Sequence, residues 1–114
     1  MGTEAFENLR LELRRGSLIL AVLAELKAEQ YGYTLRKALS HHGLEIDEGT
    51  LYPLLSRLRV QGLVNTRLEE SSEGPARKYY SLTREGRRVL TLMEEYMDTL
   101  NAGSRSLRRK GEKT

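Results

Sequence analysis

The 114-residue chain has no cysteine and no tryptophan, and it contains a single phenylalanine and two prolines. Without cysteine it can form neither disulfides nor thiolate metal sites. It also has neither an apolar run of about 20 residues nor the apolar core of a secretory leader, so we expect a soluble, cytoplasmic protein without a membrane-bound part. With so few large aromatics, its core must come from the many leucines. A chain of this length forms one domain with a modest core, which a partner subunit often enlarges.

Positive charge is concentrated in two segments, although the net charge of the whole chain is only +3. Residues 74–88 contain five basic residues and one acidic residue, and residues 104–114 have the same balance. The rest of the chain is therefore net acidic. Two basic patches on an acidic body favour a polyanionic partner, although an ordinary solvated surface explains charge of this kind equally well.

In the first half of the chain, apolar residues recur at helical spacing in three segments. The first covers about residues 5–27, and the second ends at Gly43, which readily adopts the left-handed conformation that terminates helices. Asp47 is a suitable N-cap for a third helix, which Gly62 closes. Pro53 lies beyond the first turn of that helix, so we expect a later start or a kink there.

Over residues 64–82 the apolar period changes to two, and the turn-forming sequence SSEGP separates two runs, which predicts a β-hairpin. Thr83 is a suitable N-cap for a long final helix, which Gly103 is expected to end. Residues 104–114 contain one apolar side chain and are expected to be disordered.

The predicted order of elements is helix, helix, helix, hairpin, helix. This is the order of a winged helix-turn-helix, here followed by a long helix, and it gives a mainly α fold with a β-hairpin (α+β). The chain divides into a winged DNA-binding domain over residues 1–82, a dimerisation helix over 83–103 and a basic tail over 104–114. In such a fold the third helix is suited to a major groove and the hairpin to the phosphate backbone.

Candidate nucleic-acid contacts lie on the third helix and the hairpin. Outside its apolar stripe the third helix carries short hydroxyls and long bases, as groove-reading helices do, although a solvated face has a similar composition. These residues are Thr50, Tyr52, Ser56, Arg57 and Arg59. In the hairpin, alternation places Arg77 and Tyr79 on one face and Lys78 and Tyr80 on the other, without showing which face is inward.

No motif for catalysis or metal binding is present in the sequence. His41 and His42 are neighbours whose side chains diverge by about 100° on a helix, and they have no acidic or cysteine partner at ligand spacing. Nucleophile elbows, phosphate loops and spaced carboxylate motifs are absent as well. We therefore predict that the protein is not an enzyme and that it needs no metal or other cofactor.

Three segments carry a resemblance to a known family: YGYTLRKAL at 31–39, GTLYPLLSRLRVQGLV at 49–64 and GPARKYYSLTREGRRVL at 74–90. On these segments the chain resembles PadR-family transcriptional regulators, specifically the short members with a single C-terminal helix. The resemblance implies a homodimer, formed by the first and last helices, that binds a palindrome-like operator in double-stranded DNA. We predict that this dimer acts as a repressor. The resemblance also implies the following DNA contacts: Tyr33, Lys37, Thr50, Tyr52, Arg57, Arg77, Lys78 and Tyr79.

The stripe on the final helix that includes Met93, Tyr96 and Met97 has two open interpretations. Packing between helices is the commoner use of such a stripe, and lining of an effector pocket at a dimer interface is the other. Multidrug-binding relatives stack planar compounds against an interfacial tryptophan, which this chain lacks. That type of drug site is therefore excluded, while a response to another small molecule stays open.

Other functions remain as alternatives to a DNA-binding regulator. A winged helix can also dock a protein partner through its third helix, in which case DNA binding would be weak and without sequence preference. A small enzyme or metal carrier is disfavoured by the missing motifs, and RNA binding by the lack of an evident aromatic platform. The sequence does not identify the operator, the regulated genes or an effector.

Overall fold

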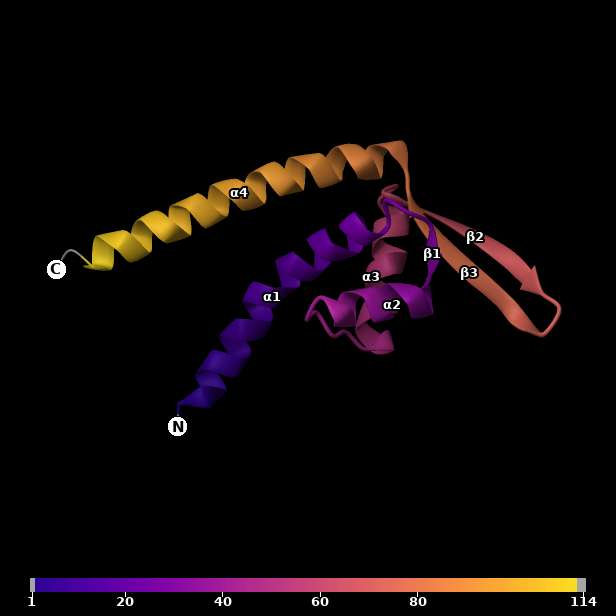
Figure 1. Ribbon diagram of the computed structural model, residues 1–114, viewed down its shortest axis with the longest axis horizontal. Helices are drawn as coiled ribbons and strands as arrows, with labels where there is room; N and C mark the ends of the chain where they lie inside the picture. The colour runs from indigo at the N-terminus through magenta and orange to yellow at the C-terminus, as the bar shows by residue number, and fades with distance from the viewer. Residues whose placement is uncertain (1, 113–114) are drawn as a thin grey trace.

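The structure is a computed structural model that describes residues 2–112. The elements in chain order are α1 (Thr3–Glu25), β1 (Gln30–Tyr31), α2 (Gly32–His41), α3 (Glu48–Val60), β2 (Val64–Ser71), β3 (Gly74–Leu82) and α4 (Arg84–Glu112). The end of α1, α2 and α3 form a central body, and the β2–β3 hairpin projects from it to one side (Figure 1). The start of α1 and most of α4 extend to the other side. The predicted winged helix-turn-helix with a long final helix is confirmed, with β1 as an element that was not predicted.

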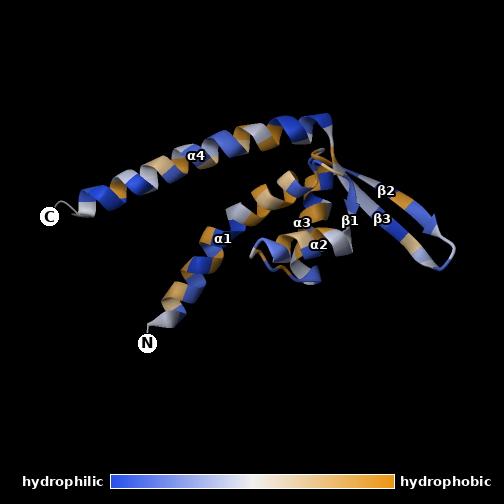
Figure 2. Cartoon of the chain, in the orientation of Figure 1, coloured by the Kyte–Doolittle hydropathy of each residue, from blue (hydrophilic) through white to orange (hydrophobic). Residues whose placement is uncertain are grey.

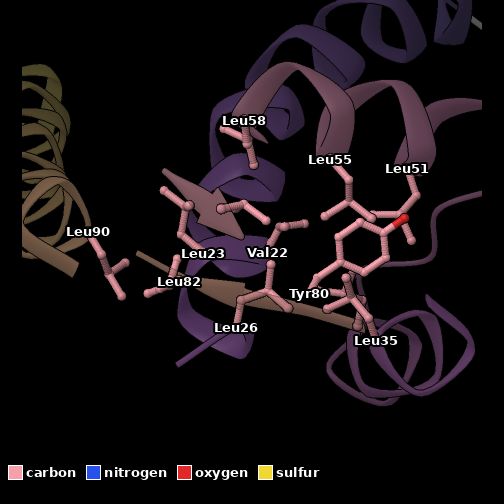
Figure 3. Close-up of a cluster of buried hydrophobic side chains, with 12 residues drawn as sticks. Val22, Leu23, Leu26, Leu35, Leu51, Leu55, Leu58, Tyr80, Leu82 and Leu90 are labelled. Carbon is pink, nitrogen blue, oxygen red and sulfur yellow. The ribbon is translucent and has the colours of Figure 1, made fainter. Parts of the chain in front are cut away.

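Leucine side chains make most of the core, which lies where α1, α2, α3 and the sheet meet (Figure 3). Three leucines of α3, namely Leu51, Leu55 and Leu58, lie on one face of the helix and are buried. Tyr80 from β3 and Leu90 from α4 complete the core. Among residues 2–111 no charged side chain is buried with them. The core is therefore small and apolar apart from the hydroxyl of Tyr80, and it holds α4 only through the first turns of that helix.

The strands form an antiparallel sheet in the order β1-β3-β2. β2 pairs along nearly the whole of β3, whereas β1 pairs only its two residues, with Tyr79 and Tyr80. The outer half of β3 therefore has a neighbouring strand on one side only. The turn occupies residues 72–73 and is tighter than the predicted SSEGP turn. Pro75, which has no N–H to donate, lies in this outer half, where an open strand edge tolerates it.

Two helices begin at the N-caps that were predicted. The carboxylate of Asp47 accepts a hydrogen bond from the backbone N–H of Thr50 at 2.7 Å, at the start of α3. The hydroxyl of Thr83 accepts one from the backbone N–H of Gly86 at 2.9 Å, at the start of α4. Both bonds satisfy backbone donors that the first turn of a helix leaves without intrahelical acceptors.

Pro53 lies inside α3, and the expected later start of this helix is wrong. The helix begins at Glu48, directly after its cap, and continues through the proline to Val60. The missing N–H of Pro53 deprives only the carbonyl of Gly49 of its usual partner. Both residues are on the exposed side of the helix, where water can replace the lost bond.

Glycines follow the ends of α2 and α3, but the glycine predicted to end α4 does not end it. Gly43 and Gly62 have positive φ values of 79° and 80° and follow the ends of α2 and α3, as predicted. Gly103 lies within α4, so the prediction that it ends this helix is wrong, as is the prediction of disorder for residues 104–112. A helical glycine costs only about 1 kcal/mol relative to alanine, and the two basic residues in the last turn complement the helix dipole. Residues 113–114 of the predicted tail lie outside the described part.

The first half of α1 and the exposed length of α4 carry apolar side chains that the body does not cover. Leu13 is 81% exposed and Tyr96 is 63% exposed. The full sets are Phe6, Leu9, Leu11 and Leu13 on α1 and Leu92, Tyr96, Leu100 and Leu107 on α4. The two helices diverge as they leave the body, and apolar residues recur along both (Figures 1 and 2). No helix within residues 2–112 has the length and hydropathy needed to cross a membrane.

Candidate nucleic-acid interface

The adjacent tyrosines of β3 face opposite sides of the sheet. Tyr80 is only 7% exposed, and its ring lies among the core leucines (Figure 3). Burial raises the pKa of its phenol, and the nearby Tyr52 raises it further. Tyr79 is half-buried on the outer face, together with Arg77, whereas Lys78 shares the inner face with Tyr80. The structure therefore places Tyr80 inward and leaves Tyr79 on the surface.

Three tyrosine rings form a continuous surface from the hairpin to α2. Tyr31 of β1 is the Cα partner of Tyr79, and their ring centroids are 5.6 Å apart in an edge-to-face arrangement. The Tyr31 ring also stacks on that of Tyr33 in α2, with centroids 6.3 Å apart and planes inclined by 28°. Aromatic pairs at these separations are attractive beyond the area that they bury.

Each ring of this surface has a cation over it. The guanidinium carbon of Arg77 lies 4.8 Å from the centroid of the Tyr31 ring, and that of Arg67 lies 4.8 Å from the Tyr79 centroid. The ammonium of Lys37 lies 5.6 Å from the Tyr33 centroid. These distances fall within the range of cation–π attraction. We call the set Tyr31, Tyr33, Lys37, Arg67, Arg77 and Tyr79 the ring–cation cluster.

Four predicted contacts belong to the ring–cation cluster although they are up to 46 positions apart in the sequence: Tyr33, Lys37, Arg77 and Tyr79. Tyr31 and Arg67, which connect and extend them, were not predicted. Tyr31 is in a two-residue strand, which is too short to show a periodic pattern, and Arg67 is one of several charged residues in β2. Placing them required the cross-strand register, in which Tyr79 lies between the two.

Arg67 is held by a carboxylate from another part of the chain. Its guanidinium donates two hydrogen bonds to Glu29, at 2.7 and 3.2 Å, and an oxygen of Glu69 lies 3.7 Å away. The hydrogen bond from Arg67 lowers the pKa of Glu29, and the same bond raises the pKa of Arg67. Both groups are therefore charged at neutral pH.

The turn between α2 and α3 is braced by Arg36. Its guanidinium forms an ion pair with Glu48 at 3.0 Å, and its Nε donates to the carbonyl of Ile46 at 3.4 Å. Because Glu48 is the first residue of α3, this pair fixes the start of α3 relative to α2. The two helices of the helix-turn-helix are thus joined by polar contacts as well as by the core.

The predicted residues of α3 do not share one face. Tyr52 is 38% exposed, and its ring lies so close to Gly32 that a Cβ there would overlap its hydroxyl. Thr50 and Arg57 are exposed on the opposite flank, where they line a hollow of about 460 Å³ between α1 and α3. Tyr52 thus packs against α2, and only part of it is available to a partner. The helical period of the sequence could not show that Tyr52 faces α2 while Thr50 and Arg57 face α1.

Comparisons with known proteins identify the family. A family model described as the transcriptional regulator PadR-like family matches residues 19–92, which include the helix-turn-helix and the hairpin. The chain belongs to the PadR-like family. It is 37% identical over 81 residues to the transcriptional regulator Rv3488 of Mycobacterium tuberculosis, covering 70% of this chain and 75% of that protein.

Solved structures of PadR regulators share the fold. A PadR-family transcriptional regulator from Eggerthella lenta is 41% identical, with a TM-score of 0.85 over 91% of this chain and 92% of its own. A PadR-like transcriptional regulator from Bacillus cereus is 33% identical, with a TM-score of 0.75 over 84% of this chain and 95% of its own. The protein is therefore a PadR-family transcriptional regulator, and the resemblance that was inferred from three sequence segments is confirmed.

In this PadR protein the residues of the proposed effector pocket lie along α4. Met93 packs against the core, Met97 is half-buried and Tyr96 is exposed. All three are near the point where α4 leaves the body, so a second subunit could cover them. The pocket itself stays a prediction.

The histidine pair of this PadR protein lies at the end of α2. The rings of His41 and His42 have centroids 5.8 Å apart, and both residues are exposed. Among the side chains of residues 2–111, no three His, Cys, Asp or Glu residues come together in a way that could hold a metal ion.

Proposed function

We propose that this PadR regulator is a homodimer that binds a palindrome-like operator and represses transcription from it. In each subunit α3 enters a major groove, and the hairpin contacts the adjacent phosphates. The observation that carries this proposal is the ring–cation cluster, which joins the hairpin to α2 and presents bases and phenols together beside α3.

The chemistry of the cluster suits a phosphate backbone. Arg77 and Lys37 supply positive charge, and the hydroxyls of Tyr33 and Tyr79 can donate hydrogen bonds to phosphate oxygens. Lys78 adds a base on the other face of β3, so the hairpin carries charge on both sides. Contacts of this kind set the position of a protein on DNA, while side chains of α3 read base edges.

The exposed apolar stripes of α1 and α4 support the homodimer. A soluble monomer rarely leaves such stripes open, and a second copy would cover them with an identical surface. Twofold symmetry would place the two α3 helices against two half-sites about 34 Å apart, or a multiple of that distance. The twofold symmetry is why we propose a palindrome-like operator.

Fluorescence anisotropy with DNA from upstream of the protein's own gene tests the operator. We expect binding at least about 10³-fold tighter than to a scrambled duplex, with two subunits per site. Equal and weak binding to both duplexes would contradict specific recognition of this fragment. A winged helix that docks a protein partner would give that result with every DNA fragment that is tried.

A paired substitution tests the role of the hairpin. Arg77→Ala with Lys78→Ala should weaken binding and reduce the slope of log K against log salt by about 1.8, because each lost phosphate contact contributes about 0.9. A comparison variant, Arg108→Ala with Arg109→Ala, removes the same charge from the second basic segment at the far end of α4, and it lowers the slope only if that segment also contacts phosphates. If both variants keep the slope of the unmodified protein, the hairpin does not contact phosphates.

The dimer is tested separately, without DNA. Leu13→Lys places a charge on the exposed stripe of α1, where it costs little within one subunit but disrupts an apolar interface. Sedimentation should show a monomer for this variant and a dimer for the unmodified protein. Val60→Lys changes a similarly exposed residue at the end of α3 and should leave the dimer intact. A dimer that tolerates Leu13→Lys would show that this stripe is not the interface.

A further inference from the structure

Two arginines on the outer face of the hairpin adopt the same pose in different surroundings. Arg67 and Arg77 each lie 4.8 Å over a tyrosine ring of the ring–cation cluster. Arg67 has two carboxylates within 4 Å, those of Glu29 and Glu69. Within residues 2–111, Arg77 has no carboxylate at that distance, although Glu69 is its Cα partner across the strands. The outer face thus carries one arginine, Arg67, whose charge is balanced by nearby carboxylates, and another, Arg77, whose charge is not.

Glu29 accounts for most of this difference. It lies just before β1, and it holds the guanidinium of Arg67 through two hydrogen bonds over a separation of 38 residues. The pair fixes the guanidinium above Tyr79, which is itself a proposed phosphate contact. An approaching phosphate would have to displace Glu29 before Arg67 could bind it, and Glu29 would repel that phosphate.

We infer that Glu29 restrains binding to DNA of arbitrary sequence by holding Arg67 away from the phosphate backbone. This inference rests on the proposed DNA-binding function. Phosphate contacts raise the affinity for every duplex equally, so they increase non-specific binding without adding sequence information. Glu29 is therefore a positioning residue for specificity: it limits the phosphate-binding charge of the hairpin and leaves more of the discrimination to α3.

The test replaces Glu29 with its uncharged isostere, in Glu29→Gln. If the released Arg67 gains one phosphate, log K for a scrambled duplex should depend on log salt with a slope steeper by about 0.9. Between about 50 and about 200 mM salt, the fold-loss of affinity should then be about 3.5 times that of the unmodified protein. The preference for operator over scrambled DNA should fall, because the operator gains less from an added non-specific contact.

The chain offers a matched control in Glu85→Gln. Glu85 accepts two hydrogen bonds from Arg88, at 2.7 and 3.1 Å, and its pKa is lowered by that contact, as for Glu29. Glu85 and Arg88 lie at the start of α4, and neither belongs to the ring–cation cluster. Glu85→Gln therefore removes the same charge from the same kind of ion pair, and it should leave the salt slope unchanged.

The double variant Glu29→Gln with Arg67→Gln identifies the group that acts. If Arg67 makes the added contact, the double variant should return to the slope of the unmodified protein. Equal slopes for Glu29→Gln and Glu85→Gln would overturn the inference and leave the proposed function intact, as would weaker DNA binding by Glu29→Gln. If the unmodified protein binds no DNA at all, the proposed function is wrong and the inference fails with it.

Discussion

Gly86 offers a direct test of how α4 is joined to the body. It is buried in the first turn of α4, and a Cβ at this position would overlap the carbonyl oxygen of Leu63. The carbonyl carbon of Leu63 would be 3.1 Å away, and a methyl group of Leu82 would be 3.2 Å away. That carbonyl cannot turn aside easily, because it accepts a hydrogen bond from the backbone N–H of Thr83 at 3.0 Å. Gly86→Ala therefore forces a shift of α4 against the α3–β2 connection.

The magnitude follows from two opposing effects. Overpacking of a buried position typically costs about 1 to 3 kcal/mol. Alanine in place of glycine gains at most about 1 kcal/mol of helix propensity, and less near a helix end. Gly49→Ala is the control, since it makes the same change in the first turn of α3, where the nearest atom is an oxygen of Asp47 at 3.5 Å. We expect Gly86→Ala to lower the free energy of unfolding by about 1 to 2 kcal/mol and Gly49→Ala to leave it unchanged or raise it.

Urea denaturation followed by circular dichroism measures this difference. The protein concentration must be the same for all variants, because the stability of a dimer depends on it. A lower midpoint for Gly86→Ala with an unchanged m-value would indicate a loss of stability without a change in the surface exposed on unfolding. Equal midpoints for the two alanine variants would refute the close contact between α4 and the carbonyl of Leu63.

Two further predictions concern the core. Leu55→Ala removes a fully buried side chain and should lower the free energy of unfolding by about 2 to 5 kcal/mol, as urea denaturation can measure; a loss below about 1 kcal/mol would contradict its burial. Burial is the main cause that raises the pKa of the Tyr80 phenol in the folded protein. The neutral phenol therefore contributes fully to the free energy of unfolding below the unfolded-state pKa of about 10, and this contribution is lost as the pH rises above that value. Tyr80→Phe should therefore reduce the loss of stability between about pH 9 and pH 11, and an unchanged pH profile would argue against this cause.

Local signals were sufficient to predict the elements of the winged domain. The caps Asp47 and Thr83 and the terminating glycines Gly43 and Gly62 depend on a few neighbouring residues, and each acts in the structure as predicted. Gly103 is also a glycine, but it lies inside α4. A glycine ends a helix only where the chain turns into the left-handed conformation, and Gly103 does not adopt it. The sequence near Gly103 does not reveal whether the helix ends at this glycine or continues through it.

The candidate interface was only partly predictable, because it depends on how separate segments meet. β1 has two residues, and only its pairing with β3 brings Tyr31 into the cluster. The ion pair of Arg67 joins positions 38 residues apart, which no local pattern can indicate. Tyr52 was predicted as a DNA contact, but the glycine at position 32 allows it to pack closely against α2. Periodicity identified which polar residues lie outside the apolar stripe of each element, while tertiary contacts decide which of them are available to bind DNA.

The open edge of β3 has a consequence for how copies of the protein behave at high concentration. An unpaired strand edge offers backbone groups to which another strand can add, and such edges are common starting points for aggregation. Pro75 interrupts the row of donors along this edge, and the bases Arg77 and Lys78 on the same stretch make two such edges repel each other. Removing these charges could therefore have a cost unrelated to DNA: edge-to-edge association of hairpins, which would appear as a loss of solubility.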